Sequence, residues 1–230
     1  MNEGDVAKNQ ETSSAFKPAQ TTSKSQVPKG INLALQGGGA HGAFTWGVLE
    51  RLLEDDRLRI EGICGTSAGA MNGAMVAYGM MNGGREGARA LLETFWRKIS
   101  ERALFSPLKP TWLDRMVGRG NMDYSPPYLM FDVLSRLYAP YQLNITGLNP
   151  LHDVLCEVVD FTRLRQCESP KLFVCATNVR TGKIKVFQPG EVSVDALLAS
   201  ACLPFMFPAV EVDGEHYWDG GFMGNPAIFP

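Results

Sequence analysis

Apolar and polar residues follow one another in segments that predict strands and helices in turn. Apolar runs of strand length lie at residues 31–35, 59–64 and 171–177. Between the first two runs, residues 43–53 carry apolar side chains at helical spacing, and a second helical stretch begins at residue 68. Strands that alternate with helices are typical of a parallel sheet covered by helices. We therefore expect an α/β fold with three layers, α/β/α, around a largely parallel central sheet.

Shorter elements are expected along the rest of the chain. Residues 106–127 are rich in proline, glycine and aromatic residues and predict an irregular stretch, whereas the apolar residues of 128–138 predict a helix. Asp213-Gly214, between two short apolar runs, predicts a hairpin turn. The other predicted elements are helices at 84–99, 150–159, 161–166 and 194–200 and a strand at 184–188.

Composition favours one domain that carries a polar tail. Residues 1–28 are rich in Ser, Thr, Gln and Lys and lack an apolar core, so we expect a disordered tail and no signal peptide. Residues 29–230 are long enough to bury a core of their own. No apolar run reaches the roughly 18 residues that a transmembrane helix requires, so we expect no transmembrane segment.

Charge and cysteine content argue against several classes of function. The chain has 22 basic and 24 acidic residues and a formal net charge of −2, so it has no basic surplus for nucleic acid. The chain has five cysteines, which is an odd number. They include no close Cys-x-x-Cys pair, and most of them lie in apolar runs. This predicts reduced core residues in a reducing, cytoplasmic compartment. No His and Cys cluster has the spacing of metal ligands, so we expect neither a metal nor a cofactor.

The sequence Gly65-Thr66-Ser67-Ala68-Gly69 stands between a predicted strand and a predicted helix. A nucleophile elbow needs this setting, because its sharp turn holds a serine hydroxyl out of the backbone. Small flanking residues give the turn room, and the helix N-terminus favours developing negative charge. The alternative is a chance match in a chain with 24 glycines. The surrounding elements favour Ser67 as a nucleophile.

A second glycine cluster follows the strand predicted at 31–35. Residues 37–42 read Gly-Gly-Gly-Ala-His-Gly and lead into the predicted helix. Backbone N–H groups of such a loop can bind the oxyanion of an acyl-transfer reaction. Gly37, Gly39 and Gly42 also match the dinucleotide fingerprint Gly-x-Gly-x-x-Gly, but the acidic residue expected at the end of the next strand is missing. Oxyanion binding is therefore favoured over nucleotide binding.

Asp219 is a candidate for the base that a serine nucleophile needs. It leaves a predicted strand and is followed by Gly220-Gly221, so the backbone beside it leaves an open approach. The simpler alternative is a turn aspartate that bonds its own backbone.

The three histidines of the chain are less suitable bases. No histidine follows Asp219, although the hydrolase order serine, acid, histidine would require one. His41 lies in the glycine loop and His152 at the start of a predicted helix. An order of Ser67, Asp195 and His216 stays open, but Asp195 lies within the helix predicted at 194–200.

Taken together, these motifs resemble those of the patatin-like phospholipase family. The features are, in order, the glycine loop at 37–42, Gly65-Thr66-Ser67-Ala68-Gly69, and Asp219-Gly220-Gly221. Residues 199–208, Ala-Ser-Ala-Cys-Leu-Pro-Phe-Met-Phe-Pro, also resemble a stretch that precedes the acidic motif in that family. The resemblance covers residues 29–230 and implies a patatin-like domain there.

The resemblance implies a serine–aspartate dyad that works without histidine. Ser67 is then the nucleophile and Asp219 the base, with oxyanion N–H groups from Gly37, Gly38 and Gly39. The resemblance further implies a lipid acyl hydrolase of the phospholipase A or lysophospholipase type, which forms an acyl-enzyme. Its substrate would be membrane or micellar lipid, reached by peripheral contact. The glycines expected to support these motifs are Gly42, Gly65, Gly69, Gly220 and Gly221.

Two departures from the family pattern affect this expectation. The family usually has arginine or lysine where this chain has His41, and an imidazole is mostly neutral at pH 7. Similar proteins also continue past the aspartate motif, so we expect a domain that is truncated or unusually short at Pro230. The alternative functions are a general carboxylesterase, or an inactive family member that binds lipid or a partner.

Large apolar residues are concentrated between residues 104 and 131. Such residues dominate protein cores, so we interpret most of them as core. The resemblance to lipid hydrolases implies that some of them line a lipid site.

Overall fold

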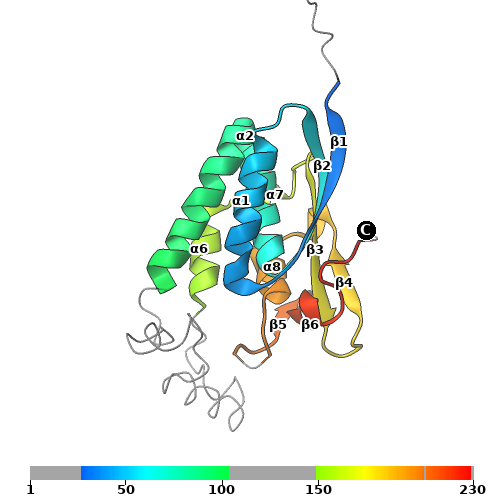
Figure 1. The fold of residues 1–230 in the computed structure, drawn as a ribbon. Helices are drawn as coiled ribbons and strands as arrows, with labels where there is room; N and C mark the ends of the chain where they lie inside the picture. Colours follow the sequence, from blue (N-terminus) through cyan, green and yellow to red (C-terminus); the bar gives the residue numbers. More distant parts are fainter. Residues whose placement is uncertain (1–26, 104–148, 205, 229–230) are drawn as a thin grey trace, which may run out of the picture.

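A mixed sheet of six strands forms the centre of the part of the molecule that the structure describes (Figure 1). The computed structural model describes residues 27–103, 149–204 and 206–228. The strands are ordered β1-β2-β3-β6-β5, and β4 pairs with β3. Their bounds are β1 Lys29–Leu35, β2 Leu58–Thr66, β3 Lys171–Asn178, β4 Ile184–Phe187, β5 Val210–Val212 and β6 Glu215–Asp219.

The three long strands run parallel and the three short strands join them antiparallel. β1 is parallel to β2, and β2 is parallel to β3. β4 and β6 are antiparallel to β3, and β5 is antiparallel to β6. The predicted α/β class is confirmed, and most strand residues lie in the parallel part. The antiparallel part arises because short connections, and not helices, join β3 to β4 and β5 to β6.

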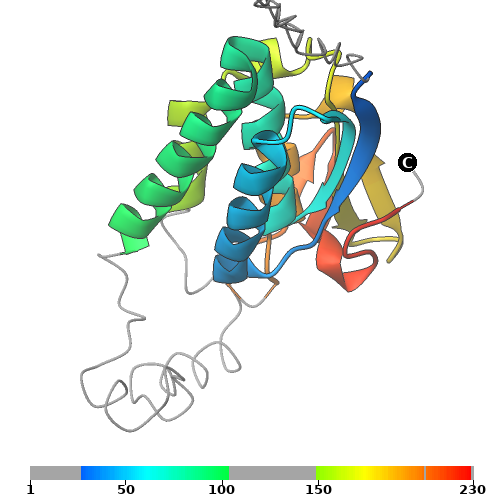
Figure 2. The ribbon, with the colours of Figure 1, turned by 45° about the horizontal axis from the view of Figure 1, so that its top comes forward.

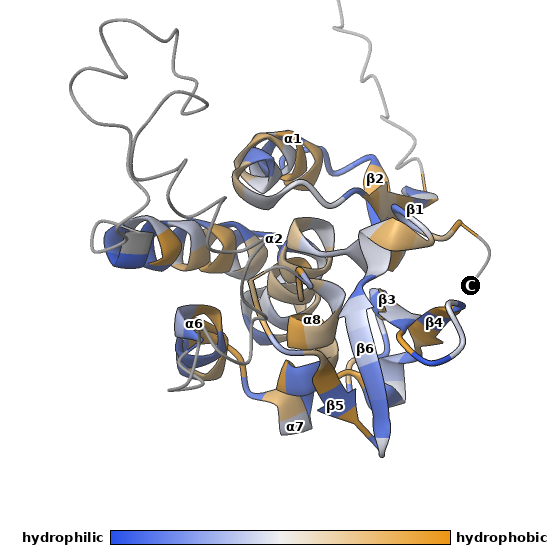
Figure 3. Cartoon of the chain, turned by 90° about the horizontal axis from the view of Figure 1, so that it is seen from below, coloured by the Kyte–Doolittle hydropathy of each residue, from blue (hydrophilic) through white to orange (hydrophobic). Residues whose placement is uncertain are grey.

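The described helices pack on one face of the sheet (Figures 1, 2 and 3). On the other face, the described residues form a small cluster in which Ala227 packs against Cys64 and Cys175. Of the three predicted layers, this part of the chain therefore shows the sheet and one helical layer. No helix in it is both long enough and apolar enough to cross a membrane. The helices are α1 Gly42–Leu53, α2 Ala68–Ala103, α6 Pro150–Val158, α7 Phe161–Leu164 and α8 Val194–Ser200.

Strands β2 and β6 meet end to end on the same edge of β3. Residues 174–175 of β3 pair with both β2 and β4, so these two strands lie on opposite edges. Residues 176–177 pair with both β4 and β6, so β6 shares the edge that β2 occupies. Thr66 ends the β2 pairing, and Asp219 begins the β6 pairing at the next position along β3. The turn that leaves β2 at Ser67 therefore lies beside the end of β6.

Within the described residues, the predicted elements agree with the structure, apart from the exact positions of their ends. The helical stretch from residue 68 and the helix predicted at 84–99 form the single element α2, which kinks at Gly83 and Gly84. Asp213 and Gly214 have φ angles of 51° and 78°, as a type I′ hairpin turn requires. The irregular stretch and the helix predicted within 106–138 lie outside the described residues, as does the predicted tail up to residue 26.

Candidate active site

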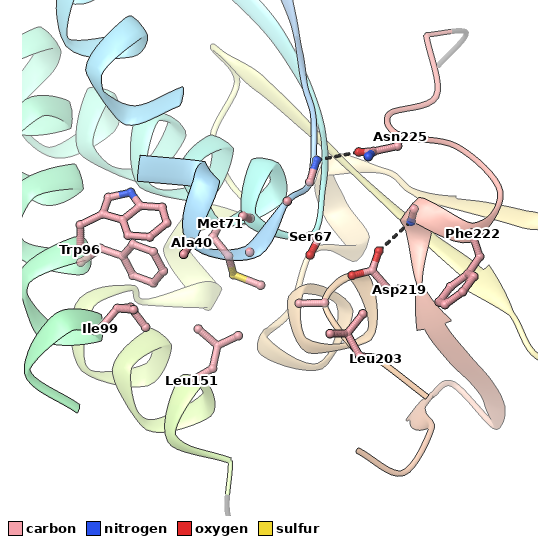
Figure 4. Close-up of a pocket in the computed structure, with 17 residues that line it drawn as sticks. Ala40, Ser67, Met71, Trp96, Ile99, Leu151, Leu203, Asp219, Phe222 and Asn225 are labelled. Carbon is pink, nitrogen blue, oxygen red and sulfur yellow. Dashed lines mark hydrogen bonds between the residues drawn. The ribbon is translucent and has the colours of Figure 1, made fainter. Parts of the chain in front are cut away.

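Ser67 lies on a sharp turn between β2 and α2 (Figure 4). Its φ of 53° is in the left-handed region, which residues with a side chain rarely adopt. The Met71 N–H donates to the Ser67 carbonyl at 3.1 Å, so α2 begins directly at the turn. The half-buried serine thus lies at a helix N-terminus, where negative charge is stabilised.

Close backbone packing maintains the conformation of this turn. A Cβ on Gly69 would overlap the Leu35 carbonyl, and one on Gly65 would lie 2.7 Å from the backbone of α2. A Cβ on Gly37 would lie 2.8 Å from the Cβ of Ser67, so the glycine loop also presses on the turn. Only glycine fits these positions, and the surrounding backbone holds Ser67 in its strained state.

Asp219 ends β6, and its carboxylate faces the Ser67 hydroxyl (Figure 4). The Asp219 N–H donates to the Cys202 carbonyl at 2.8 Å, and the Thr177 hydroxyl donates to the Asp219 carbonyl at 2.9 Å. The Gly221 N–H donates to Oδ1 of the carboxylate at 2.7 Å. Main chain and side chain are both fixed, so the orientation towards Ser67 is built into the fold.

Burial raises the pKa of the Asp219 carboxyl above its usual range. The residue is only 6% exposed, and removal from water disfavours the charged form. Hydrogen bonds from the Gly221 N–H and the Ser67 hydroxyl lower the pKa, but they do not cancel the effect of burial. A carboxylate with a raised pKa accepts a proton more readily than an exposed aspartate does.

The segment of residues 199–208 contacts both Ser67 and Asp219, a role that the sequence did not predict. Ser200, at the end of α8, is fully buried, and its Oγ accepts the Ser67 backbone N–H at 2.8 Å. The Cys202 carbonyl accepts the Asp219 N–H. The signal for this role was the motif resemblance of the segment, but only the folded structure shows what the segment holds.

Each peptide of the glycine loop between β1 and α1 is used differently. The resemblance implied that the Gly37 N–H binds an oxyanion, but in the structure this N–H donates to Asn225 Oδ1 at 2.6 Å. The Gly38 carbonyl accepts the His41 N–H, and the His41 Nδ1 also lies 3.1 Å from it. A trans peptide points its N–H opposite to its carbonyl, so the Gly39 N–H points away from His41. Within the described ranges, no protein group accepts the N–H of Gly38 or Gly39.

A cavity of about 770 Å³ opens in front of these groups (Figure 4). Its volume is typical of small-molecule sites, which span roughly 300–1,000 Å³. Ser67, Asp219 and the loop residues 37–40 border it. The predicted lining from residues 104–131 lies outside the described residues, and the apolar wall seen here comes mainly from α2, α6 and the segments after α8 and β6. Its members are Met71, Phe95, Trp96, Ile99, Leu151, Ala201, Leu203 and Phe222.

None of the three histidines of the chain borders this cavity. His152 is half-buried on α6, His216 is exposed on β6, and His41 lies in the glycine loop. Asp195 is exposed in the first turn of α8. The order of Ser67, Asp195 and His216 that the sequence left open is therefore not assembled in the structure.

The sequence matches a model of the patatin-like phospholipase family over residues 33–230. The chain belongs to the patatin-like phospholipase family. Among solved structures, VipD from Legionella pneumophila is similar at 18% sequence identity and a TM-score of 0.45. That similarity covers 84% of this chain and 46% of VipD, so the chain spans less than half of the VipD length. A comparison with curated proteins finds no match.

In this patatin-like phospholipase domain, the three motifs that resemble those of the family border one cavity. The glycine loop, the Ser67 turn and the Asp219 segment all border it. Two further motif glycines lie at close contacts. A Cβ on Gly220 would overlap the Cys175 carbonyl, and a Cβ on Gly42 would lie 2.7 Å from the Cβ of Ala68.

His41 stands where patatin-like phospholipases usually carry arginine or lysine, which predicts a weaker interaction with the glycine loop. The His41 Nδ1 lies 3.1 Å from the Gly38 carbonyl, and a guanidinium at this position would place a permanent positive charge and several donors beside that carbonyl. We expect His41→Arg to raise kcat/KM for ester hydrolysis about threefold, the size of an exposed charge effect. Initial rates of the two proteins measured under the same conditions test this, and equal kcat/KM values would show that the position has no charge role.

Proposed function

We propose that this chain is a lipid acyl hydrolase of the phospholipase A or lysophospholipase type that uses a Ser67–Asp219 dyad. One observation carries the proposal: the Ser67 hydroxyl faces a buried carboxylate on the wall of an apolar cavity that no histidine borders. A serine is a weak nucleophile until a neighbour takes its proton, and Asp219 is placed to do so. Membership of the patatin-like phospholipase family supports a lipid ester as the substrate.

Acyl transfer then proceeds in two steps at Ser67. Its Oγ attacks the ester carbonyl carbon while the hydroxyl proton passes to Asp219. The bond to the leaving alcohol breaks as Asp219 returns the proton to the departing oxygen, which leaves an acyl-enzyme. Water attacks the acyl-enzyme as Asp219 takes its proton, and the fatty acid leaves as Oγ regains a proton.

The N–H groups of Gly38 and Gly39 supply the oxyanion hole in this mechanism. Both glycines border the cavity beside Ser67, and neither N–H has an acceptor in the described part of the chain. The N-terminus of α2 adds its positive end at the same place. Removal of one such donor costs roughly 10²–10³-fold in kcat in serine hydrolases.

The apolar wall predicts a preference for long acyl chains, and Leu151→Trp tests it. Leu151 lies in the first turn of α6, is partly exposed and borders the cavity, so an indole that projects from this position would occupy part of the cavity. Excluding two methylenes from burial loses about 1.6 kcal/mol, or more than tenfold. We expect kcat/KM for a C16 ester to fall by at least about tenfold, and that for a C4 ester by less than about twofold. Nitrophenyl esters of both lengths provide the measurement.

Val48→Trp is the matched control, since Val48 is 45% exposed on α1 and does not border the cavity. It should leave both substrates unaffected. Equal rates on C4 and C16 esters in the wild type, unchanged by Leu151→Trp, would identify a general carboxylesterase instead. Folded wild type that binds fatty acid but hydrolyses no ester would identify a lipid-binding member of the family.

A further inference from the structure

Asn225 reaches across the site from the segment that follows Asp219. Its Oδ1 accepts the Gly37 N–H at 2.6 Å, over a sequence separation of 188 residues. Only the oxygen of the amide can accept a hydrogen bond, so the N–H of Gly37 also fixes which way the amide is turned. The contact therefore has a defined orientation, and it joins the C-terminal segment to the glycine loop (Figure 4).

The position of Gly37 determines where the peptides of Gly38 and Gly39 lie. A Cβ there would lie 2.8 Å from the Cβ of Ser67 and 3.0 Å from the Thr66 carbonyl, so the residue is in contact with the nucleophile turn. The peptides of Gly38 and Gly39 follow directly and border the cavity. Any displacement of Gly37 moves both N–H groups relative to Ser67.

Asn225 is itself fixed by bonds on either side. The Thr66 hydroxyl donates to the Gly224 carbonyl at 2.9 Å, and the Cys64 thiol donates to the Ala227 carbonyl at 2.8 Å. The Gly224 N–H donates to the Gly220 carbonyl at 2.9 Å, which ties the segment to the Asp219 motif. Asn225 thus extends from a segment that is anchored to β2 and to the base.

We propose that Asn225 is a positioning residue that holds the oxyanion loop in register with Ser67. The proposal rests on the function proposed above and adds to it the group that orients the oxyanion hole. Asn225 acts through Gly37, and its effect appears in the stabilisation of the oxyanion and not in the binding of the acyl chain.

Two ketone inhibitors separate these effects in the full chain. A fatty-acyl trifluoromethyl ketone forms a tetrahedral oxyanion with serine, whereas the methyl ketone of the same chain length only fills the cavity. Asn225→Leu keeps the approximate shape but removes the acceptor. We expect Asn225→Leu to weaken binding of the trifluoromethyl ketone by about 10–100-fold and binding of the methyl ketone by less than about twofold. In ester hydrolysis, kcat should fall and KM should stay unchanged. Asn225→Asp keeps an acceptor, so it should bind the trifluoromethyl ketone at least about tenfold more tightly than Asn225→Leu does.

Amide exchange at Gly37 provides a readout that does not depend on activity. The Gly37 N–H should be protected in the wild type and in Asn225→Asp, and unprotected in Asn225→Leu. Asn82→Leu, which removes an exposed side-chain bond to the Tyr78 carbonyl, is the matched control and should change neither readout. Unchanged exchange in Asn225→Leu, or equal weakening of both ketones, overturns the proposal. If the wild type hydrolyses no ester, the proposed function fails, while the exchange data still decide whether Asn225 holds the loop.

Discussion

Replacing Ser67 with alanine is expected to lower kcat for ester hydrolysis by at least about 10⁴-fold. The variant keeps a Cβ at the turn, so the strained φ of 53° and the packing against Gly37 are retained. What it loses is the hydroxyl oxygen that we propose attacks the ester carbonyl. A residual rate from the oxyanion N–H groups and substrate binding remains, as in other serine hydrolases that lack their nucleophile. Initial rates on a phospholipid and on a nitrophenyl ester, together with the melting temperature, measure the effect.

A serine-directed fluorophosphonate identifies the nucleophile directly. Mass spectrometry of the treated wild type should place one adduct on Ser67, and the Ser67→Ala variant should carry none. Ser193→Ala is the control, because it removes the helix cap that Ser193 makes on the Ala196 N–H at 3.1 Å. That variant should lose about 1 kcal/mol of stability and keep its adduct. An adduct on another serine, with Ser67 unmodified, would contradict the assignment.

The elements around the Ser67 turn were predictable because their signals are local. An apolar run, a glycine-flanked serine and a helical pattern follow one another without interruption. Each constrains its neighbours through backbone geometry alone, and the structure shows β2, the strained Ser67 and α2 in that order. The hairpin turn at Asp213-Gly214 was predictable for the same reason, since both residues tolerate positive φ.

The placement of Asp219 beside Ser67 could not be derived from local signals. It depends on β6 sharing the edge of β3 with β2, which is a matter of strand order and register. The sequence shows alternating patterns but not which strands become neighbours. The family resemblance supplied the pairing of the two residues, and the register along β3 gives it a physical cause.

The bonds that hold the site were missed because they join residues far apart in the sequence. Ser200 is 133 residues from Ser67, and Asn225 is 188 residues from Gly37. Serine and asparagine are common at helix ends and turns, so the residue types alone do not identify these contacts. The family resemblance likewise implied oxyanion donors at Gly37, Gly38 and Gly39, whereas in the structure the Gly37 N–H donates to Asn225 Oδ1. Peptide orientation within a glycine loop is decided by such long-range contacts.

Replacing Asp219 with asparagine is expected to be nearly as damaging as the loss of Ser67, with kcat lowered by at least about 10³-fold. Asparagine retains an acceptor for the Gly221 N–H, and the backbone bonds to Cys202 and Thr177 are untouched. The amide cannot take the Ser67 proton, so only the chemistry is removed. His216→Gln serves as the control, because the exposed His216 should be dispensable. A folded His216→Gln variant as inactive as Ser67→Ala would favour a base other than Asp219.

The raised pKa of Asp219 gives this prediction a dependence on pH with a definite sign. The base works when ionised, so kcat/KM of the wild type should fall on acidification, with a midpoint above the roughly 3.9 of an ordinary aspartate.

The contribution of Asp219 to the stability of the fold depends on pH in the opposite direction. Burial makes the folded protein bind this proton more tightly than the unfolded chain does, so the contribution of Asp219 is fully present at low pH and is lost as the pH rises through the folded pKa. Asp219→Asn should therefore melt above the wild type at pH 7, and the difference should shrink as the pH is lowered towards 4. An Asp219→Asn variant with a lower melting temperature than the wild type at pH 7 would show that the ionised carboxylate stabilises the fold and does not destabilise it.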